Sequence, residues 1–269
     1  GQEKVFAPGT VIISAGAEVS DVKKVVSPVL QPVRNSAVYY IDFSFDSFKL
    51  GGSAFAQSLN KIGAEAPTVR DAEYFATAFN TVQTLVEKGL ILAGHDISAG
   101  GMITALLEMC FANVEGGLEI NLDKLPEKDL VKILFSENPG ILIQVENKSE
   151  VEKILSDAGI GFLRIGRPCD ERHILINKDG SEYQFFIDHL RDVWFESSYL
   201  LDRKQSGEEA AKARFLNYKE QPIRLHFNSS FTGKLSDLKI SAYRRGRSGI
   251  KAAIIREKGV NGDREMAYA

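Results

Sequence analysis

The feature that most constrains the fold of this chain is a regular alternation between short apolar runs and longer segments with helical periodicity. The apolar runs are rich in β-branched and aromatic residues and are bounded by residues that favour turns, which is typical of buried strands. The strands predicted in this way are 10–14, 37–43, 118–122, 140–145, 162–165 and 173–177, and 90–93 is a further short apolar run. Because helices that alternate with strands must bury their apolar stripes, the pattern predicts a layered sheet with helices on one or both faces.

Between the predicted strands, apolar side chains recur at the spacing of an amphipathic helix. Such helices are predicted at 21–26, 53–59, 71–88, 102–112, 129–135, 148–158 and 188–204. In the helix predicted at 71–88, the apolar stripe is formed by Phe75, Phe79, Val82 and Val86. Gly89 follows directly and is expected to end that helix.

The character of the sequence changes after Lys204, and this change predicts the domain organisation. We expect an α/β domain over 1–204, a helical segment and linker over 205–249, and the truncated start of another domain over 250–269. The last part holds one strand-like run at 250–256 and the beginning of a helix, which cannot bury their apolar faces alone. Because the chain starts at Gly1 without an initiator Met, we expect it to be a piece of a longer protein.

Composition excludes several classes of function. The formal net charge is −3 and the sequence pI is about 5.9, which argues against a dedicated nucleic-acid-binding protein. No apolar run reaches the roughly 18 residues that a membrane span requires, so no membrane partner is expected. The two cysteines, Cys110 and Cys169, lie far apart without metal-ligand spacing, which predicts reduced thiols and a cytoplasmic protein. Cys110 falls on the apolar face of a helix and is expected to be an inert core thiol.

The strongest candidate site is the stretch 94–101, Gly-His-Asp-Ile-Ser-Ala-Gly-Gly, at a predicted strand-to-helix junction. Helix N-termini favour phosphate, Asp96 offers a hard oxygen ligand for Mg²⁺, and Ser98 offers a hydroxyl donor to a phosphate oxygen. Gly100 and Gly101 would let the backbone approach a ligand closely. The alternative is that Asp96 and Ser98 cap the helix, which is the commoner use of such residues.

Two other stretches are weaker candidates for a ligand-binding site. The Gly-rich run at 50–54 lacks the spacing of a P-loop or of a dinucleotide fingerprint, so a turn that packs closely against a helix is the expected structure. The run Ser136-Glu137-Asn138 separates a predicted helix from a predicted strand and is expected to be a turn. No residue of the chain is predicted to be catalytic.

Three runs together resemble a known family. They are Leu-Gly-Gly-Ser-Ala-Phe-Ala-Gln at 50–57, Gly-His-Asp-Ile-Ser-Ala-Gly-Gly at 94–101 and Leu-Glu-Met-Cys-Phe-Ala at 107–112. They resemble the large, single-chain phosphoribosylformylglycinamidine synthases, the glutamine-dependent ligases of purine biosynthesis. The run at 251–261 is similar to the start of that family's glutaminase domain. The resemblance covers nearly the whole chain and places it in the C-terminal α/β part of the second synthetase-like unit.

The resemblance implies a fold and an activity. It implies an α/β sandwich built on a mixed sheet, with a partly ferredoxin-like topology. The whole enzyme would use ATP and glutamine to convert formylglycinamide ribonucleotide to the amidine, while this fragment alone would be inactive. Its partners would be a nucleotide and the remaining domains of the same polypeptide, namely a β-rich synthetase-like domain and the glutaminase domain.

The resemblance also implies roles for two residues. Asp96 would be a magnesium ligand and Ser98 would contact an ADP that is held for structural reasons, which reverses the preference for helix capping. Further ligands, a lysine among them, would come from the β-rich part, which this chain lacks. The alternative is a non-catalytic scaffold domain of the same superfamily. A selenophosphate- or thiamine-phosphate-kinase relative is disfavoured by the glutaminase-like tail.

Overall fold

The computed structural model describes residues 21–220 and 226–239, together with 14, 16, 19, 253–255, 262 and 266. The chain forms two compact units, one of residues 24–227 and one that combines 1–23 with 228–269. The predicted strands at 10–14 and 250–256 and the predicted start of a helix at 263–269 fall largely outside the described residues. The three-part domain division remains a prediction.

The unit that combines 1–23 with 228–269 contains, in its described part, the start of a short 3₁₀ turn where the sequence predicted an α-helix at 21–26. A single 3₁₀ turn, η1 (Val22–Lys24), begins in this unit, and the Asp21 carboxylate accepts a hydrogen bond from the Lys23 N–H at 3.0 Å. The Val22 N–H donates to the Gly233 carbonyl at 2.9 Å, and Asp21 forms an antiparallel bridge with Lys234. The prediction of an α-helix here was wrong because this backbone pairs with residues just before η3 (Leu235–Leu238).

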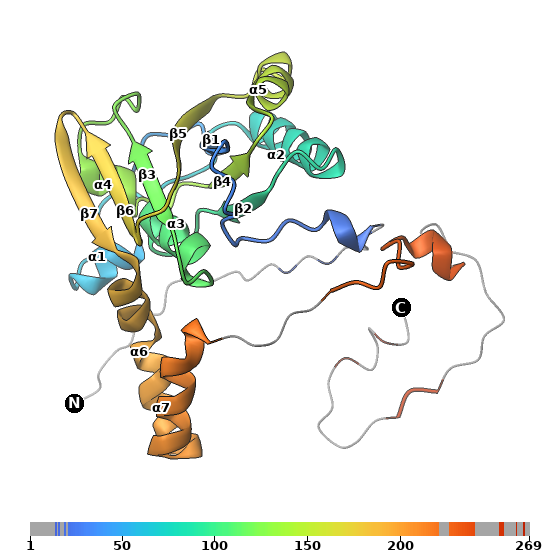
Figure 1. Cartoon of the computed structure of the whole chain (residues 1–269). Helices are drawn as coiled ribbons and strands as arrows, with labels where there is room; N and C mark the ends of the chain where they lie inside the picture. Colours follow the sequence, from blue (N-terminus) through green and yellow to red (C-terminus); the bar gives the residue numbers. More distant parts are fainter. Residues whose placement is uncertain are drawn as a thin grey trace. The chain divides into compact units, whose positions relative to one another are not determined.

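A mixed sheet forms the centre of the unit 24–227 (Figure 1). Its seven described strands lie in the order β2-β4-β1-β5-β3-β6-β7. They are β1 (Ala37–Asp42), β2 (Ala93–Asp96), β3 (Gly117–Asn121), β4 (Gly140–Val145), β5 (Phe162–Cys169), β6 (His173–Lys178) and β7 (Ser181–Phe186). Among these described strands β3 and β6 run parallel, and the other neighbouring pairs run antiparallel. The predicted α/β class and mixed sheet are confirmed.

Seven described α-helices accompany the sheet, and most begin and end where their periodicity predicts. They are α1 (Ala54–Ser58), α2 (Ala72–Glu87), α3 (Gly101–Phe111), α4 (Leu130–Phe135), α5 (Lys148–Asp157), α6 (Ile187–Ser206) and α7 (Glu208–Leu216). Asp71 caps α2 by accepting from the backbone N–H groups of Glu73 and Tyr74, and Asp129 caps α4 in the same way. No helix among the described residues is long and apolar enough to cross a membrane.

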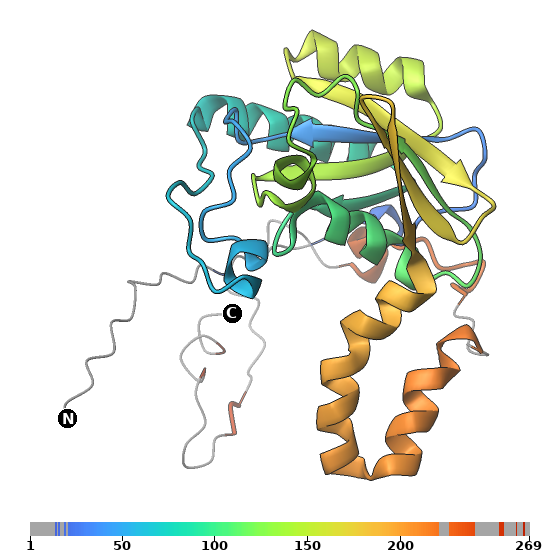
Figure 2. The ribbon, with the colours of Figure 1, turned by 90° about the vertical axis from the view of Figure 1, so that its left-hand side faces the viewer.

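The two faces of the sheet are covered to different extents. On one face, inward side chains of β1, β3, β4 and β6 join those of α3 and α4 in the larger core, and Ile187 at the start of α6 completes it. On the other face, α2 and α5 cover a smaller core whose strand residues come from β1, β4 and the first residue of β5. Figure 2 shows α2 and α5 along one face and α3 along the other. In the described part, the apolar core of the second face therefore stops at β5.

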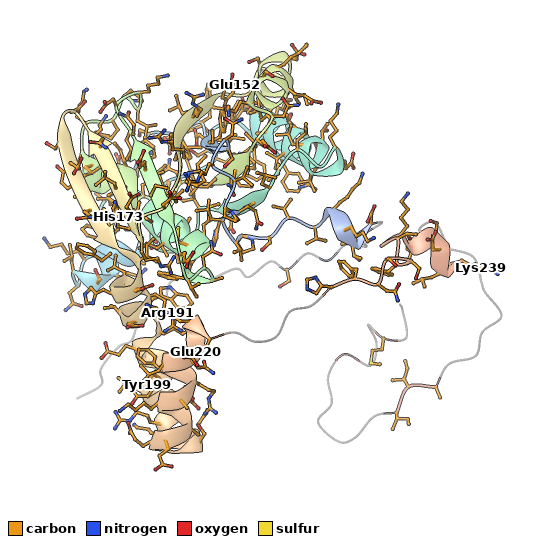
Figure 3. All side chains as sticks on the ribbon, viewed as in Figure 1. Glu152, His173, Arg191, Tyr199, Glu220 and Lys239 are labelled. Atoms are coloured by element: carbon orange, nitrogen blue, oxygen red, sulfur yellow. The ribbon has the colours of Figure 1, made fainter. Side chains whose placement is uncertain are left out.

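The helices α6 and α7 form an antiparallel hairpin after the last strand. Arg191 is 5% exposed, donates to the Phe215 carbonyl at 3.0 Å and lies 4.4 Å from the centre of the Phe195 ring. Tyr199 stacks on Phe215 with their ring centres 4.8 Å apart. Figure 3 labels Arg191 and Tyr199 on this hairpin. A buried guanidinium between aromatic rings thus fixes α7 against α6.

Candidate functional site

The stretch 94–101 forms the junction between β2 and α3, as the sequence predicted. The Ile97 N–H donates to the Gly140 carbonyl at 2.9 Å, which carries the backbone out of the sheet beside β4. Gly100 has φ 88° and is the N-cap residue of α3, and no side chain caps this helix. The alternative in which Asp96 and Ser98 cap the helix is therefore wrong, because a left-handed glycine begins it instead.

The glycine pair serves the packing of the chain itself. A Cβ atom at Gly100 would lie 2.3 Å from the Thr104 Oγ1, and one at Gly101 would lie 2.6 Å from the Leu134 carbonyl oxygen. Both positions have a positive φ, which an L side chain rarely adopts. The two glycines thus permit a tight turn pressed against α4, whereas the sequence interpretation assigned them to close approach of a ligand.

Asp96 and Ser98 both lie on the surface of this junction. The Asp96 side chain is 77% exposed, and its Oδ1 lies 3.6 Å from the Nδ1 of His95. His95 is held more tightly, since its Nδ1 lies 2.7 Å from the Asp96 carbonyl oxygen and its Nε2 lies 3.0 Å from the Glu108 Oε2. The imidazole therefore connects the end of β2 to α3, and leaves the Asp96 carboxylate facing solvent.

Glu137 joins the two Gly-rich stretches, a role that its sequence context did not reveal. Its Oε1 accepts from the Gly100 N–H at 2.9 Å and from the Ala54 N–H at 2.7 Å. The run at 50–54 is a turn that leads into α1, as predicted, and Ser53 caps α1 by accepting from the Ala56 N–H. The Gly100 N–H group is thus bonded to a carboxylate of the chain and is not available to a phosphate.

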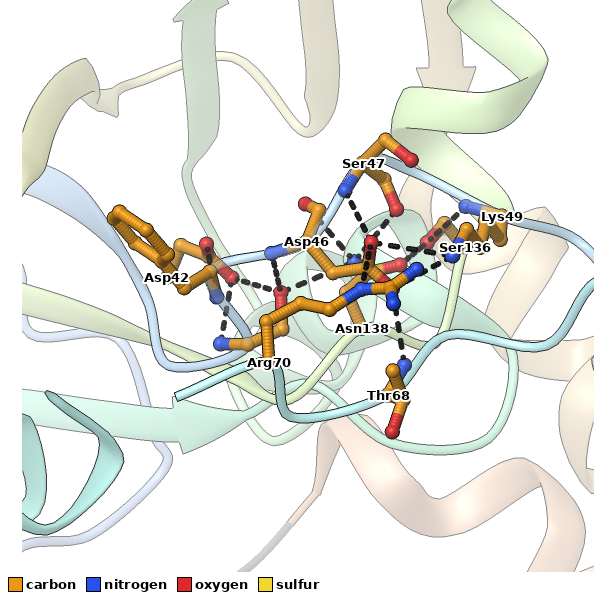
Figure 4. Close-up of polar contacts among 10 residues, drawn as sticks. Asp42, Asp46, Ser47, Lys49, Thr68, Arg70, Ser136 and Asn138 are labelled. Carbon is orange, nitrogen blue, oxygen red and sulfur yellow. Dashed lines mark hydrogen bonds and ion pairs between the residues drawn. The ribbon is translucent and has the colours of Figure 1, made fainter. Parts of the chain in front are cut away.

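A polar network that is buried except for Arg70 includes the two residues that flank Glu137 in sequence. We call it the Asp46 cluster; it consists of Asp46, Lys49, Arg70, Ser136 and Asn138 (Figure 4). Asp46 is 5% exposed and pairs with Lys49 at 2.9 Å and with Arg70 at 3.0 Å. Asn138 donates to the Ser47 carbonyl at 3.0 Å and accepts from the Ser136 hydroxyl. The run 136–138, expected to be a plain turn, is therefore tied into a loop nearly a hundred residues earlier.

The charge of Asp46 is stabilised by its partners. Burial alone would raise the pKa of this carboxyl group. Hydrogen bonds from Lys49 and Arg70, with others from the backbone N–H groups of Thr68 and Ser47, outweigh burial and hold the pKa well below its usual range. A charge held in this way is a structural anchor, because every oxygen of the carboxylate is already bonded.

Asp96 and Ser98 fit part of a magnesium–nucleotide site. Magnesium usually keeps several waters and takes one or two protein carboxylates together with substrate phosphates. Asp96 supplies one exposed hard oxygen ligand, and the exposed Ser98 supplies a hydroxyl two residues later. In the part of the chain that the structure describes, no group of three or more His, Cys, Asp and Glu side chains is arranged to hold a metal ion. The donors therefore suit a metal whose other ligands are water, nucleotide or groups outside the described residues.

Residues 45–176, which contain both loops, Glu137 and the Asp46 cluster, match the family described as AIR synthase related protein, C-terminal domain. This part of the chain is a domain of that family. The family resemblance seen in the sequence is confirmed by curated relatives that align along the entire chain. A human phosphoribosylformylglycinamidine synthase is 34% identical over 100% of this chain and 20% of its own length. A probable phosphoribosylformylglycinamidine synthase of Caenorhabditis elegans is 36% identical over 99% of this chain and 21% of its own length. The chain thus spans about a fifth of the relatives it matches.

Solved structures of Thermotoga maritima PurL share the fold. The structure complexed with ATP aligns with a TM-score of 0.50 over 63% of this chain and 28% of its own, at 15% identity. The structure complexed with FGAR has a TM-score of 0.50 over 63% of this chain and 30% of its own, at 19% identity. At these identities the likeness shows the fold alone, and it agrees with the mixed sheet described above.

Proposed function

We propose that this chain is one segment of a phosphoribosylformylglycinamidine synthase, an ATP- and glutamine-dependent ligase of purine biosynthesis. Its relatives carry that name, and the chain corresponds to about a fifth of their length. In this proposal the segment contributes a subdomain that binds a magnesium–nucleotide complex, and the nucleotide is an ADP retained for structural reasons. The isolated segment is expected to be inactive, since the glutaminase domain and the β-rich synthetase-like domain provide the rest of the enzyme.

The observation that carries the nucleotide-binding role is the exposed Asp96 carboxylate at the carboxyl end of β2. His95 and Glu108 hold the backbone around it, so the carboxylate is presented from a fixed position. The Asp96 side chain does not cap the helix α3. In α/β folds ligands gather where strands end and helices begin, and Mg²⁺ prefers carboxylate oxygen. We assign Asp96 to the metal and Ser98 to a phosphate oxygen.

The proposed site is a partial one, which sets the expected affinity. One carboxylate and one hydroxyl, both exposed, leave most of a nucleotide in water. When bound, the metal would neutralise phosphate charge; Asp96 would orient it, and Ser98 would fix one phosphate oxygen. We expect the 269-residue chain to bind Mg·ADP weakly and not to hydrolyse ATP.

The test is a calorimetric titration of Mg·ADP into the 269-residue chain and into three variants. Asp96→Ala should remove measurable binding, and Asp96→Asn should weaken it strongly because the amide lacks the charge that Mg²⁺ favours. Asp157→Ala is the matched control, since Asp157 is an exposed carboxylate on α5 that pairs with Lys153. Chelation of magnesium should reproduce the effect of Asp96→Ala. Binding of Mg·ADP that survives Asp96→Ala would show that the assignment of Asp96 is wrong.

A scaffold role is the second candidate, and exposed apolar side chains on α6 favour it. Val193, Trp194 and Leu201 are 54%, 48% and 58% exposed. Apolar side chains gathered in this way mark surfaces that dock against other protein. Analytical ultracentrifugation over a concentration series tests this candidate, because such a face should drive self-association of the isolated chain. A monomer at high concentration would contradict it.

The cellular compartment stays a prediction. The sequence favours a cytoplasmic setting, whereas a relative from Arabidopsis thaliana, 35% identical over 99% of this chain, is named chloroplastic/mitochondrial. Membership of this family is therefore compatible with more than one compartment.

A further inference from the structure

The uncovered half of the sheet carries a cavity of about 700 Å³ that no part of the proposed function uses. It lies over β5 and β3 and is bounded by the segment before β1 and by the start of α5. Five basic side chains line it: Arg34, Lys124, Lys148, Arg164 and Arg167. Two strands, β1 and β4, separate β5 from β2, so this cavity is distinct from the junction that holds Asp96 (Figure 1).

The lining has an excess of positive charge. Two acidic residues, Glu119 and Asp123, face the five basic ones. Arg167 is neutralised by Glu119 at 2.7 Å, and Arg34 pairs at 2.7 Å with Asp170. Asp123 is also close to basic groups, and its pKa is lowered chiefly by a hydrogen bond from the Asp179 backbone N–H.

Three of the five basic groups have no carboxylate partner among the described residues. Lys148 donates to the backbone and side-chain oxygens of Asn35, and Arg164 lies close to the Tyr39 hydroxyl, which donates to Glu152. The described part of the chain shows no ion pair for Lys124, which is exposed at the rim. In a chain with a net charge of −3, three cations that line one cavity outside any described ion pair favour an anionic ligand.

The remaining lining specifies the kind of anion. Asn121 and Asn177, on neighbouring parallel strands, add side-chain amides, and Lys148 stands in the first turn of α5, where the helix dipole adds positive potential. Among the described residues no aromatic ring lines the cavity, and the apolar ones that do are Ala37, Ile120 and Ile165. A nucleobase would therefore find no stacking surface, whereas phosphate groups would find charged donors.

We propose that this cavity is a binding site for a small phosphate or diphosphate anion, held by Arg164, Lys148 and Lys124. Arg164 is an exposed residue of β5, so the pairing of β5 with β1 sets where its side chain begins. Ammonium groups from the α5 and β3 sides supply point charges around it. The proposal is independent of the nucleotide role of Asp96.

Inorganic pyrophosphate, titrated calorimetrically into the 269-residue chain at 150 mM NaCl, tests the proposal. We expect saturable binding at one site, weaker binding of inorganic phosphate, and no competition from Mg·ADP. Arg164→Gln and Lys148→Gln should each reduce the affinity for pyrophosphate by about tenfold, the cost of losing one hydrogen bond to a charged group. Arg203→Gln is the matched control, since Arg203 is a partly exposed cation on α6 that pairs with Glu208.

Two safeguards keep the outcome interpretable. Lys124→Gln alters an exposed side chain with no described hydrogen bond or ion pair, so it tests the site even where Arg164→Gln disturbs folding through Tyr39. Pyrophosphate binding should persist in Asp96→Ala, which separates failure of this site from failure of the nucleotide site. The proposal is overturned by the absence of saturable binding, by an equal loss in Arg203→Gln, or by an acidic polypeptide that binds where pyrophosphate does not.

Discussion

The two faces of the sheet differ in how far apolar side chains extend across them. On one face, apolar side chains run across β1, β3, β4 and β6 and are buried under α3, α4 and the start of α6. On the other face the apolar pattern covers β1 and β4 and then gives way, on β5 and β3, to Arg164, Arg167, Glu119 and Asn121. The same strands thus contribute to a core on one side and to an open charged surface on the other.

This difference arises because successive side chains of a strand point to opposite faces of the sheet. In β6, Ile174 and Ile176 are fully buried in the larger core, whereas Leu175 and Asn177 point to the other face and are half-buried. A strand that is apolar on both sides would demand helices on both faces, as β1 does. A strand that alternates leaves room for a ligand or another domain.

The largest expected effect comes from adjacent residues of β6. Ile176→Ala should lower the free energy of unfolding by about 2–5 kcal/mol, because it leaves a cavity in the larger core. Leu175→Ala, one residue earlier, should cost about 1 kcal/mol, because its side chain lies on the incompletely covered face. Urea unfolding followed by circular dichroism measures both. Equal losses would mean that the second face is covered more completely than the described residues indicate.

A second prediction contrasts the Asp46 cluster with the open cavity, since Asp46 is buried and fully paired. Its pKa is lowered by bonds from Lys49, Arg70 and backbone N–H groups, so Asp46 stays charged in the folded protein below the ordinary value of about 3.9. The contribution of Asp46 to stability is therefore complete above that value and is lost as the pH falls toward the folded pKa.

Asp46→Asn should lower stability at pH 7 by removing this charge, and the variant should lose less stability than the wild type between pH 4 and pH 2. Thermal unfolding at a series of pH values tests the expectation. Asp157→Asn is the control, because its partner Lys153 is 72% exposed and such pairs contribute little. If Asp46→Asn and the wild type showed parallel pH profiles, Asp46 would not be the group that titrates.

The smallest expected effect is a difference in labelling rate between the two thiols, without a change in stability. Cys110 is fully buried in the larger core, which confirms its predicted core position, and burial raises its pKa to about 12. Cys169, at the end of β5, is half-exposed, and burial with help from Glu171 raises its pKa to about 11. A disulfide reagent at pH 8 should therefore modify Cys169 slowly and Cys110 only after unfolding. Fast labelling of the Cys169→Ser variant in the folded state would contradict the burial of Cys110.

Sequence periodicity predicted most elements but not their order in the sheet. The strand at 140–145 and the helices around 71–88 and 148–158 are found within one residue of the predicted bounds, because each has a strong apolar pattern and clear end signals. β5 extends beyond the predicted 165 to Cys169, and β7 was missed. β7 is an edge strand with mostly exposed side chains, so no apolar alternation marks it. Strand order depends on pairings far apart in sequence, as between β1 and β4, which local patterns do not encode.

In the candidate site, too, local features could be predicted from the sequence and long-range contacts could not. The position of Asp96 and Ser98 at a strand-to-helix junction follows from local pattern, and their proposed roles come from the family resemblance. Glu137 lies in a run that looks like an ordinary turn, and its bonds to Gly100 and Ala54 arise from tertiary packing alone. A local sequence signal for such a contact does not exist, because the partner groups are backbone N–H groups of any residue.

The bonds of Glu137 have a mechanical consequence. One carboxylate oxygen serves as the common acceptor for the turn before α3 and the turn before α1. A contact of about 3.6 Å is no longer a hydrogen bond, so a larger shift of either turn breaks its bond or moves the carboxylate. A displacement of either turn is thus transmitted to the other through the Glu137 Oε1 atom, so the turns before α1 and α3 are expected to move together.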